Sequence, residues 1–216
     1  MVYQSKYYNF ILRLITACIL APIALLIVQL SGFYFTAMIL VAAVIMGGEW
    51  FQITYHQNKA WKIYGALYIA LACLSLLWII QQHHVVHNTI KFNGINTVIS
   101  IFIIVWANDI GGYVFGRLLG GAKLCPKISP NKTWTGFFGG ILLAVAVSPV
   151  IGEGLGAAGI AAMIASAGDL LESWSKRKCK VKDSSDLIPG HGGLLDRVDG
   201  ILLLSIVVAI MGIWSK

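Results

Sequence analysis

Long apolar stretches, separated by short polar segments, run through the 216-residue chain from near its beginning to its end. The apolar residues are continuous rather than alternating, which is typical of membrane-spanning helices and not of the strands of a membrane barrel. A helix needs about 20 mostly apolar residues to cross a hydrocarbon core. The pattern therefore predicts an all-α integral membrane protein, a polytopic bundle of about seven transmembrane helices. We expect the spans at residues 10–30, 33–51, 62–80, 95–116, 134–151, 155–175 and 197–215.

The composition agrees with a membrane location, because 58% of the residues are hydrophobic and only 12% are charged, against about 25% charged in a soluble domain. All but Lys91 and Lys216 of the 16 Lys and Arg residues fall on the face that carries the N-terminus and the loops at 52–61, 117–133 and 176–196. Cytoplasmic loops carry the positive excess, so this asymmetry predicts a cytoplasmic N-terminus. The net charge of +7 is explained by this topology and by anionic membrane lipids, with no nucleic-acid partner.

The segments between the predicted spans are too short to form a soluble domain. We expect residues 1–93 to form N-terminal transmembrane helices with about three spans, and residues 94–216 to form a catalytic transmembrane region with about four. Two cytoplasmic loops, at 117–133 and 176–196, belong to the second region. Any chemistry must therefore be carried out by helix ends and by these loops at the membrane surface.

Five carboxylates lie in or at the ends of the predicted spans, where an ionisable group costs about 3 kcal/mol and is a functional candidate by default. They are Asp109, Asp169, Glu172, Asp196 and Asp199. The acids at 169 and 172 are three residues apart, as are those at 196 and 199, so each pair shares one helical face. Mg²⁺ prefers oxygen ligands, often one or two carboxylates with phosphates and waters. The five acids are therefore candidate metal ligands, and the alternative is that each pairs with a nearby Lys or Arg. A further acid, Glu49, is interpreted as a polar packing or ion-pair residue.

The two cytoplasmic loops supply positive charge that suits phosphate groups. The candidate donors in the loop at 176–196 are Lys176, Arg177, Lys182, Gly192 and Gly193. Glycines can expose backbone N–H groups in a turn that other residues do not tolerate. The candidates in the loop at 117–133 are Ser129, Lys132 and Thr133, which precede a helix N-terminus, where anions are favoured. His191, in the glycine turn, either donates to a phosphate, acts in acid–base chemistry or makes a structural hydrogen bond.

Residues 173–199 match a specific signature, S-x-hydrophobic-K-R-x4-K-D-x-small-x2-aliphatic-P-x-H-G-G-hydrophobic-x-D-R-hydrophobic-D, with Ser175 at the first hydrophobic position. The residues in register are Ser173, Lys176, Arg177, Lys182, Asp183, Ser185, Ile188, Pro189, His191, Gly192, Gly193, Leu194, Asp196, Arg197, Val198 and Asp199. The elements G-D-L-x-E-S at 168–173 and D-x-x-A-Y-x-x-G-R at 109–117 also agree, the latter with Gly112 for alanine. In S-P-x-K-T-x-E-G at 129–136, Thr135 replaces the glutamate. On these residues the chain resembles the phosphatidate cytidylyltransferases, also called CDP-diacylglycerol synthases.

The resemblance implies a membrane-embedded nucleotidyltransferase that condenses phosphatidate with CTP, giving CDP-diacylglycerol and pyrophosphate for phospholipid biosynthesis. It implies dependence on Mg²⁺, with a second metal or a monovalent ion left open. It also implies a location in a bacterial-type inner membrane, an active site that faces the cytoplasm, and a homodimer as one possible oligomeric state. The residues expected to take part in catalysis are Asp169, Lys182, His191, Asp196 and Arg197.

Other functions stay open on the residues alone. Another CTP-dependent lipid enzyme, such as a polyprenol kinase or an ether-lipid cytidylyltransferase, would use the same types of residue. A small ion or anion transporter also combines intramembrane acids with basic mouths. An inactive homologue is a third alternative, because of Thr135. The gathering of the acids near one face of the membrane favours an enzyme over a transporter.

Overall fold

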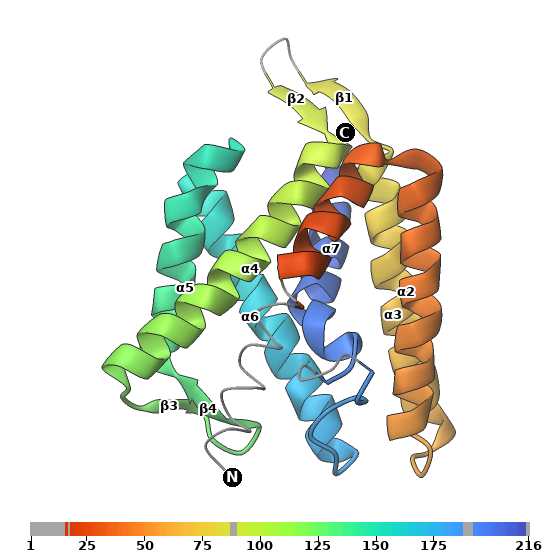
Figure 1. Ribbon diagram of the computed structural model, residues 1–216, viewed down its shortest axis with the longest axis vertical. Helices are drawn as coiled ribbons and strands as arrows, with labels where there is room; N and C mark the ends of the chain where they lie inside the picture. Colours follow the sequence, from red (N-terminus) through yellow and green to blue (C-terminus); the bar gives the residue numbers. More distant parts are fainter. Residues whose placement is uncertain (1–15, 17, 87–89, 188–191, 215–216) are drawn as a thin grey trace.

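The structure is a computed structural model that describes residues 16, 18–86, 90–187 and 192–214. Its helices follow the predicted spans one for one (Figure 1). They are the helix Cys18–Leu30, α2 (Gly32–Ile53), α3 (Lys59–Ile80), α4 (Gly94–Leu119), α5 (Trp134–Val147) followed by the 3₁₀ turn η1 (Ser148–Ile151), α6 (Leu155–Lys178) and α7 (Leu195–Trp214). Five of these, α2 to α6 with η1 counted in α5, are long and apolar enough to cross a membrane. The prediction of a polytopic helical membrane protein is confirmed.

Two short hairpins were not predicted. The strands β1 (His83–Val86) and β2 (Ile90–Asn93) pair between α3 and α4, and β3 (Lys123–Cys125) and β4 (Ser129–Thr133) pair between α4 and α5. Each strand has three to five residues, which is too short for an alternating pattern to stand out beside the long apolar stretches. The segment expected to be the loop at 117–133 is therefore largely a hairpin.

The segment expected to be the loop at 176–196 is shorter than predicted, because both flanking helices extend into it. Helix α6 continues through Lys176 and Arg177 to Lys178, and α7 begins at Leu195, so Asp196 lies in its first turn. Lys and Arg are good helix formers, and positive charge is stabilising at a helix C-terminus. Lys176 and Arg177 are thus helical residues and not loop residues, which corrects the predicted boundary.

The connections between helices lie at two opposite ends of the bundle. Figure 1 shows the α2–α3 turn, the β3–β4 hairpin and the α6–α7 connection at one end, and the β1–β2 hairpin and the α5–α6 turn at the other. These are the two sets of segments that the predicted topology assigned to opposite faces of the membrane. The loops at 52–61, 117–133 and 176–196, which carry most of the basic residues expected on one face, therefore share one end of the molecule. Lys6 and Arg13 lie outside the described residues, and which side of a membrane this end faces stays a prediction.

Glycines allow close approach between the helices that carry the candidate acids. A Cβ atom added at Gly168 of α6 would lie 2.8 Å from the carbonyl oxygen of Asp199 in α7. One added at Gly111 of α4 would lie 2.6 Å from the carbonyl oxygen of Gly139 in α5. The contacts join α4 to α5 and α6 to α7 at backbone distance, as expected for small residues at helix interfaces in membranes. They bring the acids of α6 and α7 together.

A single large hydrophobic cluster ties the first helices to the last. Its buried members include Val28, Phe35, Trp50, Ile79 and Leu202, so residues from the first half of the chain pack with residues of α7. Ser205 in α7 also donates a hydrogen bond to the carbonyl oxygen of Ala72 in α3, at 3.4 Å. Helix α7 is therefore held from both sides, by α3 and by α6.

Candidate functional site

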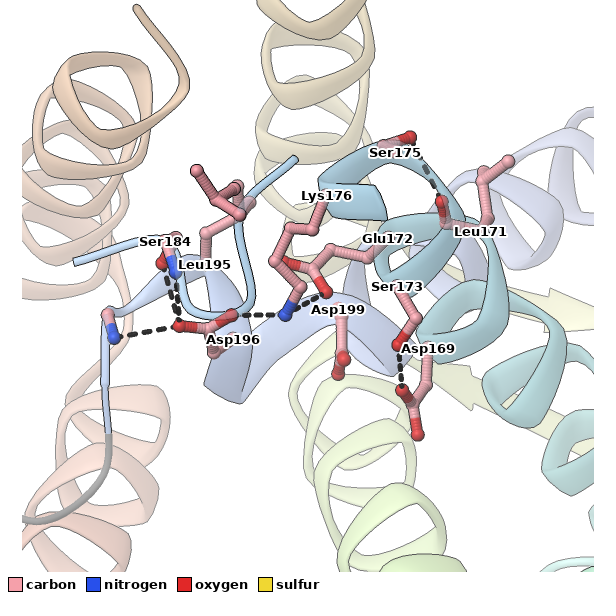
Figure 2. A network of polar contacts seen from close by, with 12 residues as sticks. Asp169, Leu171, Glu172, Ser173, Ser175, Lys176, Ser184, Leu195, Asp196 and Asp199 are labelled. Atoms are coloured by element: carbon pink, nitrogen blue, oxygen red, sulfur yellow. Dashed lines mark hydrogen bonds and ion pairs between the residues drawn. The ribbon is translucent and has the colours of Figure 1, made fainter. Parts of the chain in front are cut away.

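Lys176 lies between two acids at the junction of α6 and α7 (Figure 2). Its Nζ is 2.6 Å from Oε2 of Glu172, one turn back on α6, and it also pairs with Oδ1 of Asp196 on α7. The side chains of Lys176, Glu172 and Asp196 are 10%, 5% and 5% exposed. Lys176 was expected to bind a phosphate, and the structure places it as an internal cation between carboxylates.

Asp196 also holds the segment that precedes α7. Its Oδ2 accepts hydrogen bonds from the backbone N–H of Ser184 at 2.8 Å, from the Ser184 hydroxyl at 2.8 Å and from the backbone N–H of Gly193 at 2.9 Å. Both oxygens of Asp196 therefore have partners within the protein. Carboxylates that accept several N–H bonds are well stabilised in their charged form without a metal.

Steric constraints explain the glycines at positions 192 and 193 of the predicted glycine turn. Gly192 has a φ of +85°, in the left-handed region that favours glycine. A Cβ atom at Gly193 would lie 1.9 Å from Oγ of Ser184 and 2.6 Å from Oε1 of Glu49. The backbone of this turn approaches side chains too closely for any other residue, so both glycines have a structural reason beyond phosphate binding.

Lys132 on β4 joins the second predicted loop to the acids. Its Nζ pairs with Oδ2 of Asp169 on α6, and both side chains are 28% exposed. Ser173 approaches the other oxygen of Asp169, at 3.4 Å. This ion pair lies nearer to solvent than the pairs of Lys176, so its partners are more easily exchanged.

Asp199 lies close to the other acids of this end of the bundle. The carboxylates of Asp169, Glu172 and Asp109 all repel its charge, and Asp109 in turn lies within electrostatic range of Lys132 and Arg197. Helices α4, α6 and α7 thus bring four acids into one region, the acidic cluster of Asp109, Asp169, Glu172 and Asp199. The convergence expected from the spacing of these residues is present in the structure.

The acidic cluster has chemistry that suits Mg²⁺. Within the described residues no set of three acidic, His or Cys side chains is close enough to hold a metal by itself, but Mg²⁺ is commonly bound by one or two carboxylates together with waters and phosphates. Oε1 of Glu172 is buried and has no hydrogen-bond partner among the residues that the structure describes, and a buried carboxylate oxygen is costly without one. The carboxylates of Glu172 and Asp169 lie within electrostatic range of Asp199, and one or two of these acids with phosphates and waters would suit Mg²⁺.

Other predicted phosphate ligands have structural partners. Arg177 donates from Nε to the carbonyl oxygen of Ile128 at 3.1 Å and from Nη1 to that of Val181 at 2.9 Å, so it ties the β3–β4 hairpin to the α6–α7 connection. Thr133 is buried, and its hydroxyl accepts from the backbone N–H of Gly136 at 3.1 Å. It is the N-cap of α5, where such a residue stabilises a helix by about 1 kcal/mol.

The remaining predicted site residues have varied positions. Ser129 lies on β4 opposite Cys125, and Lys182 and Arg197 are exposed. His191 lies outside the described residues. Thr135, which replaces the glutamate of the signature element, donates a hydrogen bond to the carbonyl oxygen of Gly120. It therefore secures the turn between α4 and β3.

Glu49 is the polar packing residue that the sequence predicted, but its partners were not foreseen. This residue of α2 is 5% exposed and accepts hydrogen bonds from residues on both sides of the glycine turn. The sequence offered one indication, an acid at the end of an apolar span near the expected site. Its partners are more than 130 positions away in the chain, so they could not be read from spacing.

A comparison with known protein families finds a match over most of the chain. A model described as the cytidylyltransferase family matches residues 11–90 and 58–214. The chain belongs to the cytidylyltransferase family. The match extends beyond the signature elements between residues 109 and 199 and covers most of the chain.

Curated relatives of this cytidylyltransferase family member cover most of it. It is 35% identical over 199 residues to a phosphatidate cytidylyltransferase of Brucella suis biovar 1 (strain 1330), covering 87% of this chain and 69% of the relative. It is 36% identical over 214 residues to one of Rickettsia bellii (strain RML369-C), covering 90% and 87%. A relative of the same name from Staphylococcus epidermidis (strain ATCC 35984) is 44% identical over 124 residues, covering 53% and 48%.

Proposed function

We propose that this protein condenses phosphatidate with CTP, giving CDP-diacylglycerol and pyrophosphate. The observation that carries the proposal is the meeting of lysine–carboxylate pairs with an acidic cluster at the basic end of the bundle. The relatives that cover most of the chain bear the name of this activity. A transporter would need polar groups along the whole path through the membrane, whereas these acids gather at one end.

The reaction joins two polyanions. A phosphate oxygen of phosphatidate attacks the α-phosphorus of CTP, a new P–O bond forms, the bond to the β-phosphate breaks, and pyrophosphate leaves with the electron pair. No protein nucleophile is needed, because the lipid phosphate is the attacking group. The protein must therefore neutralise charge and hold the two substrates in line.

The ion pairs contain lysines that can exchange a carboxylate partner for a phosphate. Lys132 pairs with Asp169 at a partly exposed position, so a phosphate oxygen of CTP can replace the carboxylate as its partner. Lys182 and Arg197 are exposed near the same end of the bundle and are suited to hold the pyrophosphate. Lys176 is more deeply buried, and we assign it the task of keeping Glu172 and Asp196 in place.

We assign Mg²⁺ to the acidic cluster, where one or two of the carboxylates of Asp169, Glu172 and Asp199 would bind it together with phosphates and waters. A bound Mg²⁺ would neutralise the charge on phosphate oxygens in the transition state. Asp196, whose oxygens already have four partners, supports the site by positioning the first turn of α7. The active site would face the cytoplasm of a bacterial-type inner membrane, since the basic residues gather at the same end.

The proposal is tested with the purified protein in detergent, given labelled CTP, phosphatidate and Mg²⁺. We expect release of pyrophosphate and formation of a CDP-lipid. Asp169→Asn should lower kcat by about 100- to 1,000-fold, the cost of losing one preorganised charge contact, while Glu153→Gln at the opposite end of the bundle should not change it. Full turnover by Asp169→Asn at limiting Mg²⁺ would contradict the assignment of the cluster.

The transfer assay with other lipids and a flux measurement distinguish the other functions. Transfer to a polyprenol or an ether lipid in preference to phosphatidate would change the substrate while keeping the chemistry. Flux of ions or anions in proteoliposomes without CTP, together with no CDP-lipid, would identify a transporter and refute the proposal.

A further inference from the structure

Glu49 of α2 lies outside the signature of residues 173–199, yet it holds that segment in place. Its Oε1 accepts from the Ser185 hydroxyl at 2.6 Å and from the backbone N–H of Leu194 at 2.9 Å. Its Oε2 accepts from the backbone N–H of Leu195 at 2.8 Å, with the Ser184 hydroxyl at 3.2 Å. Donors therefore meet both oxygens of one buried carboxylate.

The partners lie on both sides of the glycine turn. The serines precede the turn, and the two leucines follow it, with Leu195 the first residue of α7. The backbone N–H groups at a helix N-terminus have no partner within the helix and favour a negative charge. Glu49 thus joins Ser184 and Ser185 to Leu194 and Leu195 and anchors the start of α7 at the same time.

The contact continues into the acidic site through Asp196. Asp196 follows Leu195, pairs with Lys176, and accepts from Ser184 and Gly193 on the opposite side of the same loop. Lys176 in turn contacts Glu172. A displacement of the backbone at 194–195 would therefore move Asp196 and its partner Lys176, together with the start of α7, where Asp199 follows one turn after Leu195.

We propose that Glu49 is a positioning residue for the nucleotidyl transfer, which holds Ser184, Ser185 and the start of α7 beside the acidic cluster. The inference rests on the proposed function for its kinetic consequence, but its structural part stands without it. It assigns a role in the site to the N-terminal half of the chain, which the signature does not include.

The carboxylate itself is required, and not only its shape. Glutamine has the same size, but it replaces one oxygen with an NH₂ group, which would face a backbone N–H donor, of Leu194 or of Leu195, in either orientation of the amide. The close packing of Glu49 also explains the glycine at position 193, where a Cβ atom would lie 2.8 Å from Cδ of Glu49. Glu49→Gln therefore loosens the loop while leaving the packing of α2 unchanged.

The first experiment does not depend on activity. Lys182 is exposed two residues before Ser184, and trypsin must bind several residues on both sides of the bond that it cleaves. Cleavage after Lys182, followed by mass spectrometry of the detergent-solubilised protein, therefore reports how often Ser184 and Ser185 leave Glu49. We expect Glu49→Gln to be cleaved about tenfold faster than the wild type, because local opening becomes easier when buried hydrogen bonds are lost. The matched control Glu153→Gln should be cleaved at the wild-type rate. Equal cleavage of all three proteins would overturn the proposal, whatever their activity.

The second experiment measures kinetics with CTP and phosphatidate. Glu49→Gln should lower kcat by about 10- to 100-fold, as loss of a supporting residue does, with a smaller change in KM for CTP and with the Tm of the bundle retained. A role in folding alone would lower the Tm and the active fraction but leave kcat per active molecule unchanged, and that result would overturn the proposal. A wild type without transfer activity would refute the proposed function, while the cleavage rates would still decide the role of Glu49.

A second variant covers the case in which Glu49→Gln does not fold. Ser185→Ala removes one donor to Oε1 and leaves the two backbone donors in place. We expect its loop to be cleaved a few times faster than that of the wild type, with a correspondingly smaller loss of kcat. Wild-type cleavage by this variant, at an unchanged Tm, would contradict the anchoring of the loop by Glu49.

Discussion

The end of α6 and the beginning of α7 each present two carboxylates three residues apart, but the partners of Asp169 and Asp196 differ. On α7, the Asp196 side chain is 5% exposed and its oxygens meet Lys176, Ser184 and Gly193. On α6, Asp169 is 28% exposed and pairs with Lys132 from the β3–β4 hairpin. Asp196 therefore holds the protein's own backbone, while Asp169 lies where a substrate phosphate can compete for its partner.

This difference separates two contributions to one site. A buried carboxylate with several donors fixes geometry, and its removal leaves a lysine and N–H groups without partners. A partly exposed ion pair contributes little to stability and is free to change partners. Variants of the two aspartates should therefore differ in what they disturb, even though each belongs to a pair with the same spacing.

Asp196→Asn should have the largest effect. Whichever way the amide is turned, its NH₂ group faces either Lys176 or the donors of Ser184 and Gly193. We expect a loss of about 3 kcal/mol of stability, as for other broken buried pairs, together with a severe loss of activity. Thermal denaturation in detergent measures the first effect, and the CDP-lipid assay measures the second.

Asp169→Asn is the matched control for this comparison. Its ion pair is partly exposed, so we expect less than about 1 kcal/mol of destabilisation despite the loss of turnover. If Asp169→Asn lowered the Tm as much as Asp196→Asn does, the distinction between a structural and an exchangeable carboxylate would be wrong.

Gly168→Ala tests whether the two helix ends must lie this close together. The new methyl group would lie 2.8 Å from the carbonyl oxygen of Asp199 and 3.0 Å from Cβ of Leu203. We expect a loss of about 1–3 kcal/mol of stability from overpacking, and a lower kcat because Asp199 moves away from Asp169. Thermal denaturation and the transfer assay provide both measurements.

Gly47→Ala provides the control for that substitution. Gly47 lies within α2, and a Cβ atom there would meet no atom within 4 Å. Alanine is the better helix former by about 1 kcal/mol, so the Tm should stay the same or rise. A loss of stability in Gly47→Ala as large as that in Gly168→Ala would show that the contact between α6 and α7 is not responsible.

The sequence was sufficient for the helices because each apolar stretch is long and continuous. Every predicted span has a helix in the structure, whereas strands of three to five residues escaped notice because so few residues carry little periodic information. The convergence of Asp169, Glu172 and Asp199 was also accessible, because helical spacing and the order of the spans place these acids at one end of the bundle.

The partners of individual side chains were not accessible in the same way. The contact between Glu172 and Lys176 follows from their i, i+4 spacing within one helix. The contacts of Glu49 depend on how α2 packs against the start of α7, which no local pattern encodes. Sequence spacing thus identified the acids of the site, and the three-dimensional packing showed which of them hold the backbone and which meet exchangeable cations.

Lys132→Gln should have the smallest effect on stability and activity, and it tests the comparison by changing the lysine that pairs with Asp169. The loss of a partly exposed ion pair should cost less than about 1 kcal/mol of stability, but the loss of a charged donor to phosphate should raise KM for CTP by about tenfold. Lys123→Gln, which removes an exposed lysine from the other strand of the same hairpin, should leave KM unchanged. An unaltered KM in Lys132→Gln, accompanied by a fall in Tm, would mean that Lys132 serves the fold and that Asp169, like Asp196, is a structural carboxylate.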